Sequence, residues 1–292
     1  MPLTYDFSFQ LGTTGFVLND NSPTSYPTVD IHGIQGLDSA PIRTTVKDRE
    51  GADGAYVDAE FDQARNIVLS GWLYDDATNT EVTLDQLKED WAPSSIPVPF
   101  YYRFPKVGER LAWVKPTGCH YDIDQLRRLG MCEVEFTAIA GDPRLYAATE
   151  TLRSTGVTNT IQTGFGFNRS FNFGFGGITS NSNALLVINA GNRPTPAVYR
   201  MYGPYAYPHI QVNDAEMVFD MIVGGTGDYL EVDTATHRVD FHGPFGVQNR
   251  RDTLRRPTWV DLESGTNVVQ FSVEGMASGA THMDVIYRSA WR

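Results

Sequence analysis

The sequence is poor in cysteine. Cys119 and Cys132 are its only cysteines among 292 residues, which is too few for a secreted disulfide scaffold. Both lie in apparently paired strands around a turn near residues 125–128, where they are either cross-strand neighbours or two buried, reduced thiols. Reduced thiols fit a cytosolic chain better.

Long apolar runs and export signals are also missing. The longest apolar stretch of the second half spans residues 184–188, whereas crossing a bilayer takes roughly 20 apolar residues. The first ten residues, MPLTYDFSFQ, have neither the basic region nor the apolar region of a secretory signal peptide. We therefore expect a soluble chain, without membrane insertion, that is not exported by itself.

Basic side chains are fewer than acidic ones. The chain has 23 basic and 35 acidic side chains, and its formal net charge is −12 at pH 7. Binding nucleic acid through its phosphates needs a basic face, so we expect no specific nucleic-acid binding. One dense basic cluster lies in the stretch NRRDTLRRP and contains Arg250, Arg251, Arg255 and Arg256. It is either a solvated loop or a loop that docks on an acidic protein neighbour.

Sequence motifs for catalysis and metal binding are absent. The six histidines form neither an H-x-H nor an H-E-x-x-H pattern, and two distant cysteines cannot complete a zinc site. No G-x-S-x-G nucleophile motif occurs. A carboxylate pair for glycoside hydrolysis stays open, because such a pair is spaced in three dimensions and not along the chain. We predict a protein that is not an enzyme and that uses no cofactor or metal.

Three acids alternate in the stretch VDAEFD. On a single strand, Asp58, Glu60 and Asp62 would share one face, where their charges repel one another. Calcium sites usually take their ligands from loops that also supply carbonyl oxygens. A solvated acidic strand face is therefore the better interpretation.

Turn chemistry is abundant. The chain contains 27 glycines and 16 prolines, and short runs of β-branched and aromatic residues lie between them. In the first half, the runs that predict strands are 66–74, 97–104, 110–116 and 131–140. This pattern indicates a mainly β fold.

One segment of the first half, TLDQLKEDW, predicts a short helix. Leu84, Leu87 and Trp91 would share its apolar face. Thr83 and Gln86 have the spacing of a capping box, so the helix should begin at Thr83.

The character of the chain changes after Gly141-Asp142-Pro143. Residues 147–163 are polar and rich in threonine, and strand-like runs then follow at short spacing. About nine such runs, with turns roughly every 8–12 residues, are typical of a β-sandwich or jelly roll. The runs are 184–190, 196–202, 208–213, 216–223, 228–233, 237–242, 257–262, 266–273 and 282–288. We predict an N-terminal β domain over 1–146, a linker arm over 147–177 and a C-terminal β-sandwich over 178–292.

The predicted linker contains the stretch GFGFNRSFNFGFGG, from Gly164 to Gly177. It is no phosphate-binding loop, because Arg169 stands where the third glycine belongs and the following residues have strand spacing. Phe171, Phe173 and Phe175 recur at every second position and would form one face of an extended segment. We expect that row to be buried against a sheet edge or face.

Five stretches resemble, in order, the distal tail proteins of long-tailed, non-contractile bacteriophages. RNIVLSGWLYDD resembles the family's basic-then-strand stretch, and GDPRLY resembles the tag that closes its first domain. TGFGFNRSFNFGFGG is similar to the family's Phe-rich linker, although proline is absent from it. NAGNRPTPAVYRMYGP resembles the beginning of the second domain. YLEVDTATHRVDF, WVDLESGTNVVQF and DVIYRSAW resemble its closing strands, so the likeness covers most of the chain from about residue 60 onward.

The resemblance implies a structural virion protein of the tail tip. Its first domain would be a β-sandwich with one helix that forms a hexameric ring below the tail tube, and its second would be a galectin-like sandwich that projects outward. The ring would join the tail tube protein, the tape measure protein, the tail-associated fibre or lysin protein and any receptor-binding proteins, after assembly in the host cytoplasm.

In such a ring, the alternating acids Asp58, Glu60 and Asp62 are candidates for facing the bore, where DNA must pass without sticking. The outer face of the ring is the other position open to them. The four arginines of the basic cluster are candidates for docking on other tail proteins.

Two other functions remain open. A galectin-like sandwich can bind carbohydrate by aromatic stacking, and the second half contains Trp259 and many tyrosines. A hydrolase of cell-wall polysaccharide is the other possibility. A ring-shaped particle with a central hole favours the tail hub, whereas a small particle favours either alternative.

Overall fold

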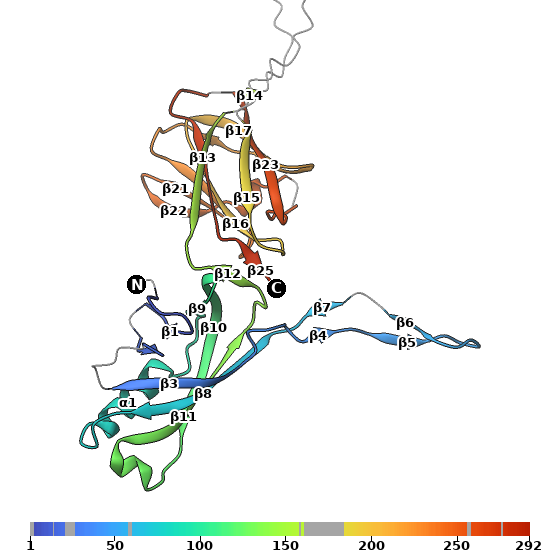
Figure 1. Ribbon diagram of the computed structural model, residues 1–292. Coiled ribbons are helices and arrows are strands. Elements are labelled where there is room, and N and C mark those ends of the chain that lie inside the picture. The colour runs from blue at the N-terminus through green and yellow to red at the C-terminus, as the bar shows by residue number, and fades with distance from the viewer. Residues whose placement is uncertain are drawn as a thin grey trace, which may run out of the picture. The chain divides into compact units, whose positions relative to one another are not determined.

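The chain divides into two compact units, Met1–Ala148 with Arg292, and Thr149–Trp291. The computed structural model describes residues 3–13, 15–20, 27–57, 60–157, 159–160, 184–255, 258–275 and 277–292. Both units consist mainly of strands, as predicted, and Figure 1 colours them along the chain. No helix among the described residues is long and apolar enough to cross a membrane.

The first unit is built on strands that follow one continuous hydrogen-bonded order. These strands are β1 (Phe9–Leu11), β2 (Val17–Leu18), β3 (Thr28–Gln35), β8 (Arg65–Tyr74), β9 (Val98–Phe104), β10 (Gly108–Tyr121), β11 (Met131–Ala140) and β12 (Leu145–Ala147). The order is β2-β1-β9-β10-β11-β8-β3, and β12 also pairs with β10. The long β10 pairs with β9 through its first half and with β11 through its second, with a register shift between Pro116 and Gly118. It thereby joins the two halves of the unit.

Asn19 links the two ends of this strand order. It directly follows β2, and its backbone N–H donates to the carbonyl of Val29 on β3 at 2.8 Å. Its side-chain Oδ1 accepts the N–H of Ile31 at 2.5 Å, and its Nδ2 donates to the carbonyl of the same residue at 3.3 Å. A side-chain amide thus satisfies part of the edge of β3 that a further strand would otherwise cover.

The predicted helix is present as α1 (Thr80–Asp90), but it begins earlier than predicted. Leu84, Leu87 and Trp91 are buried, as the apolar stripe predicts, and the Trp91 and Phe136 ring centroids lie 4.8 Å apart. The capping box is wrong. Thr83 lies inside the helix, and its hydroxyl donates to a carboxylate oxygen of Asp75 at 2.5 Å.

A two-stranded arm leaves the first unit between β3 and β8. Its strands are β4 (Ile42–Arg43), β5 (Val46–Asp48), β6 (Ala55–Val57) and β7 (Phe61–Asp62), with β4 paired to β7 and β5 to β6. Figure 1 shows it extending away from the other strands of the unit. Residues 42–57 and 60–62 are called the arm below. Its base requires glycine, because Gly36 has φ +86° and a Cβ there would lie 2.0 Å from the carbonyl oxygen of Asn66.

The second unit is a β-sandwich, as predicted. Its strands are β13 (Thr151–Gly156), β14 (Asn159–Thr160), β15 (Leu185–Asn189), β16 (Ala197–Tyr202), β17 (Tyr205–Val212), β18 (Ala215–Val218), β19 (Ile222–Val223), β20 (Tyr229–Asp233), β21 (Arg238–Gly243), β22 (Gly246–Asn249), β23 (Gly265–Gly275), β24 (His282–Tyr287) and β25 (Ala290–Trp291). One sheet has the order β13-β24-β16-β20-β21-β22, and the other has the order β14-β23-β17-β18 with β15 on β23 and β19 on β17. Large side chains from both sheets, including Tyr199 and Phe271, meet in one core.

Two predicted segments of the second unit differ from the structure. Residues 151–156 fall in the predicted linker 147–177 but form β13, which pairs along its whole length with β24. The predicted strand at 257–262 is wrong, because among its described residues only Leu262 makes a bridge, with Thr195. β22 was not predicted. Phe171, Phe173 and Phe175 lie outside the described residues, so their predicted burial stays a prediction.

Candidate functional site

The predicted acidic strand face is not a single strand. β6 ends at Val57 and β7 begins at Phe61, while Glu60 is exposed and belongs to neither. Asp58 lies outside the described residues. Asp62 forms an ion pair with Arg292 at 2.9 Å, so its charge is partly neutralised. Glu60 is therefore not part of a regular strand face, and for Asp58 the expected alignment stays a prediction.

A different acidic surface, missed in the sequence, lies on β8, β10 and β11. Along β11 every second side chain points away from the core, so Glu133 and Glu135 are exposed. Glu135 stands opposite Ser70 on one neighbouring strand and opposite His120 on the other. These residues belong to an open depression of about 300 Å³, which is lined by Ser70, His120, Tyr121, Asp122, Glu133, Val134 and Glu135.

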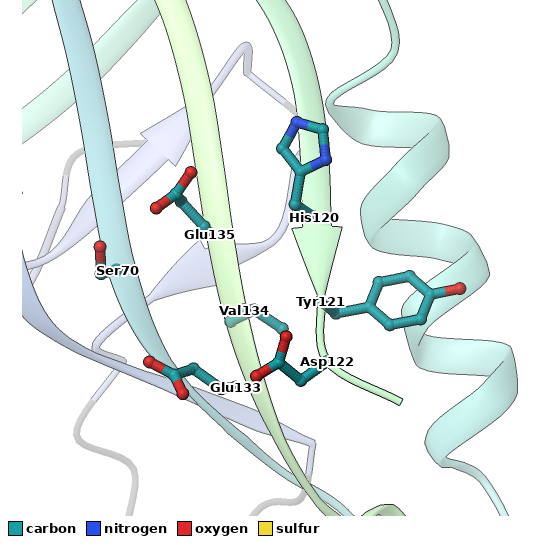
Figure 2. Close-up of a pocket in the computed structure, with 7 residues that line it drawn as sticks. All are labelled: Ser70, His120, Tyr121, Asp122, Glu133, Val134 and Glu135. Carbon is teal, nitrogen blue, oxygen red and sulfur yellow. The ribbon is translucent and has the colours of Figure 1, made fainter. Parts of the chain in front are cut away.

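Figure 2 shows how these side chains lie. Glu133 and Glu135 project from the same strand, whereas Tyr121 turns toward α1. The Tyr121 ring lies 5.0 Å from the Lys88 ammonium, a cation–π contact that ties it to the helix. The exposed acids therefore face an open sheet surface. We call Glu133, Glu135 and Asp122 the acidic sheet face.

The depression holds no catalytic arrangement. Ser70 and His120 lie on strands separated by β11, which puts their backbones about 10 Å apart, too far for a hydrogen-bonded nucleophile and base. No ion pair within the described part of the chain neutralises Glu133 or Glu135. No group of three His, Cys, Asp or Glu side chains among the described residues is arranged to hold a metal ion. The alternation in MCEVEFTAIA was the available signal for this surface.

The predicted docking arginines are partly engaged within the second unit. The Arg250 guanidinium donates to the Gln248 side-chain oxygen at 2.7 Å. The Arg251 guanidinium carbon lies 5.8 Å from the Trp259 ring centroid. Arg255 lies 5.5 Å above the Tyr207 ring and forms an ion pair with Asp220 at 3.2 Å. Arg256 lies outside the described residues.

Trp259 does not offer a free stacking platform. The His237 ring stacks on it at 4.7 Å between centroids and 17° between planes, and Arg251 approaches it as well. A sugar ring needs an uncovered aromatic face, so these contacts weaken the argument for carbohydrate binding at this residue.

Four further rings of the second unit stack on one another across adjacent strands. Tyr202 stacks on His282 with centroids 4.5 Å apart, and Tyr229 stacks on His242 at 4.3 Å. Tyr202 and Tyr229 also contact each other at 5.1 Å. Direct cross-strand pairing places these rings in one row, so their faces are largely covered by one another.

The two cysteines are free thiols and do not stand opposite each other. Cys119 is paired with Phe136, whereas Cys132 is paired with Leu73. Burial, with a smaller contribution from Cys132, raises the pKa of Cys119 to about 11. Burial also raises the pKa of Cys132. A high thiol pKa keeps both residues protonated and unreactive near neutral pH.

Arg65 is a fully buried residue, and no sequence motif indicated its burial. Its Nε donates to the carbonyl of Pro143 at 2.5 Å, and its Nη1 donates to the carbonyl of Gly36 at 3.2 Å. Burial lowers the pKa of Arg65, while nearby Tyr102 and Asp38 act in the opposite direction. The guanidinium thus fastens the base of the arm to the Gly-Asp-Pro segment near the end of the first unit.

Comparisons with known proteins reveal likeness in structure alone. No protein-family model matches the chain, and no curated protein sequence does. The crystal structure of the SPP1 Dit protein, described as a paradigm of the hub adsorption apparatus in phages that infect Gram-positive bacteria, matches with a TM-score of 0.64 at 14% identity. That match covers 99% of this chain and 100% of the other.

Chains from the phage P2 baseplate in its activated conformation match as well. The structure with Ca has a TM-score of 0.56 at 12% identity, covering 97% of this chain and 98% of the other. The structure with Sr has a TM-score of 0.54 at 11% identity, covering 96% and 97%. The likeness therefore extends over both units in the same order, and the chain has the fold of these phage hub and baseplate proteins.

Proposed function

We propose that this protein is a structural component of a phage tail tip, a distal hub that connects the tail tube to the adsorption apparatus. The observation that carries the proposal is the match over 99% of this chain to a complete hub protein. A β-sandwich alone would be weak support, because many unrelated proteins contain one. Here the match runs through both units of this chain and over 100% of the hub protein's chain.

The hub is a ring of six copies. A closed ring repeats one heterologous interface, in which two different surfaces of the same chain meet. Its partners are the tail tube protein, the tape measure protein, the tail-associated fibre or lysin protein and receptor-binding proteins. The loop with Arg250, Arg251, Arg255 and Arg256 remains a docking candidate on the second unit, whose galectin-like character is also part of this proposal.

The bore of this ring is acidic. Each copy carries a formal charge of −12, and an acidic wall repels DNA phosphates, whereas a basic wall holds them. The acidic sheet face is a better candidate for this wall than Asp58, Glu60 and Asp62. Its two glutamates are exposed without an ion pair among the described residues, whereas Asp62 is paired with Arg292.

The protein acts without catalysis in this proposal. The depression lined by Ser70, His120 and Glu135 lacks a hydrogen-bonded nucleophile and base. The carbohydrate-binding alternative loses its best-placed aromatic residue, since Trp259 is covered by His237 and Arg251. The hub function needs neither a metal nor a cofactor, because it consists of contacts between proteins.

Gold-labelled antibodies against the purified protein test the location. We expect gold at the distal end of the tails of phage particles produced by cells that carry this sequence, seen in negatively stained images. Antibodies absorbed with the purified protein are the control and should leave the tails bare. Labelling of capsids, or of soluble material alone, would contradict the hub function.

A further inference from the structure

The arm exposes more apolar surface than an isolated strand pair can sustain. Five large apolar side chains on it are between 46% and 62% exposed: Ile42, Val46, Tyr56, Val57 and Phe61. A lone two-stranded ribbon is at best marginally stable in water. Exposed apolar side chains that gather on one projecting element mark an interaction surface.

The two faces of the arm differ in chemistry. Side chains alternate between the faces of a strand, so directly paired residues share a face. Val46 is paired with Val57, which makes one face aliphatic at this level. Lys47 is paired with Tyr56 on the opposite face, where the guanidinium carbon of Arg49 lies 5.0 Å from the Tyr56 ring centroid.

The base of the arm also has an aromatic ring next to a cation. Arg43 is paired with Phe61, and its guanidinium carbon lies 5.7 Å from that ring centroid. Ile42 is paired with Asp62, and the pairing shifts by one residue between β4–β7 and β5–β6, so the faces at the base are not continuous with those at Val46 and Val57. The Tyr56 and Phe61 rings are each covered by a cation of the arm itself. The face that consists of Val46 and Val57, called the aliphatic face below, is therefore the one that gains most from a partner.

A second apolar surface lies in the connection between β10 and β11, which contains the 3₁₀ helix η1 (Leu126–Leu129). Ile123 is 82% exposed and Leu129 is 70% exposed, with Leu126 at 37%. An ion pair between Arg127 and Glu81 holds this connection against α1. Ile123, Leu126 and Leu129 are called the loop patch below.

The aliphatic face and the loop patch lie at opposite ends of the same strands. The arm enters β8 at Arg65, whose partner Ala140 ends β11. The loop patch precedes Met131, which is paired with Tyr74 at the other end of β8. Ten residues of strand separate the two ends, which corresponds to about 30 Å. Two unlike apolar surfaces at opposite ends of one unit suit a head-to-tail contact between copies.

We propose that the aliphatic face of the arm packs on the loop patch of a second copy of this chain. This inference rests on the proposed ring and names the interface that would close it. Each copy offers one arm and one loop patch, so the contact can repeat around the ring until both surfaces of every copy are occupied.

Two aspartate variants of neighbouring arm residues test which face makes the contact. Val57 and Tyr56 are 62% and 60% exposed, and they point to opposite faces. Val57→Asp should weaken self-association at least about tenfold, because the charge would be buried at the contact. Tyr56→Asp adds the same charge on the other face and should assemble like wild type. Mass photometry across a concentration series measures the self-association of both variants. Val46→Asp should weaken self-association as Val57→Asp does.

A mixing experiment tests the pairing of the two surfaces. The Val57→Asp chain keeps its loop patch, and a Leu129→Asp chain keeps its arm. Each should be monomeric alone, whereas an equimolar mixture should form a heterodimer and no ring, because one intact contact remains. Unchanged thermal unfolding of each variant shows that it is folded.

Three results would overturn the interface. They are wild-type assembly of Val57→Asp, a mixture without heterodimer, or a wild-type protein that stays monomeric throughout the series. If Val57→Asp still forms rings, the proposed interface is wrong, but the proposed hub function is unaffected. Gold labelling away from the distal end of the tail, by contrast, would contradict the proposed hub function itself.

Discussion

Replacing Arg65 with methionine should destabilise the first unit by about 2–4 kcal/mol. The substitution removes two charge-assisted hydrogen bonds and leaves the carbonyls of Pro143 and Gly36 without their donors in a buried site. Both acceptors are backbone groups, so no side-chain rearrangement can remove them. In thermal unfolding of the full chain, we expect the transition of the first unit to fall by roughly 3 °C per kcal/mol.

Arg128→Met is the matched control for this prediction. Arg128 is exposed and makes no side-chain hydrogen bond, ion pair or ring contact within the described residues, so its substitution should change stability by less than about 0.5 kcal/mol. Arg65→Lys should resemble Arg65→Met, because a single ammonium cannot reproduce the forked donation to two carbonyls. Wild-type stability of Arg65→Met would show that the buried guanidinium does not fasten the base of the arm.

Replacing Phe271 with alanine should destabilise the second unit by about 3–5 kcal/mol. Phe271 is fully buried at the centre of the sandwich and meets the Tyr205 ring edge to face at 6.1 Å between centroids. Its loss removes apolar contacts and leaves a cavity that the two sheets cannot fully close. Differential scanning calorimetry of the full chain should show the transition of the second unit shifted downward.

Phe245→Ala serves as the control for Phe271→Ala. Phe245 is 91% exposed at the turn between β21 and β22, so its removal should leave the transition nearly unchanged. Each core variant should move only one transition, because Arg65 and Phe271 lie in different compact units. A single transition that shifts equally in both variants would contradict independent unfolding of the units.

Local patterns predicted the elements whose side chains are buried within the chain itself. The apolar spacing of Leu84, Leu87 and Trp91 identified α1 because all three pack into the core of their own unit. The start of the helix was misjudged because Asn79 caps it without a side-chain hydrogen bond. Thr83, the expected cap, instead binds Asp75, eight residues earlier in the chain.

The same patterns failed to predict edge strands and irregular segments. Half of the residues of β13 are exposed and most are polar, and the strand lies at the edge of its sheet, so the sequence resembles a linker. The segment around Trp259 alternates like a strand, yet its described residues make only one bridge. There the alternation arises because Trp259 packs against the core and against His237. It does not arise from continuous backbone pairing.

The candidate surfaces were harder to predict than the cores, for a physical reason. The acidic sheet face consists of the outward residues of a regular strand, so Glu133 and Glu135 carry no motif of their own. The apolar residues of the arm are exposed in the single chain, and no pattern within that chain specifies what covers them. A contact surface is specified jointly by the two molecules that form it. The sequence of this chain therefore contains only its own part of the pattern.

Negative-stain imaging of the purified full-length protein tests the central claim most directly. The hub function predicts ring-shaped particles with six-fold symmetry and a central hole, which should become more abundant as protein concentration rises. Small particles of single-copy size at every concentration, with no ring among them, would contradict it.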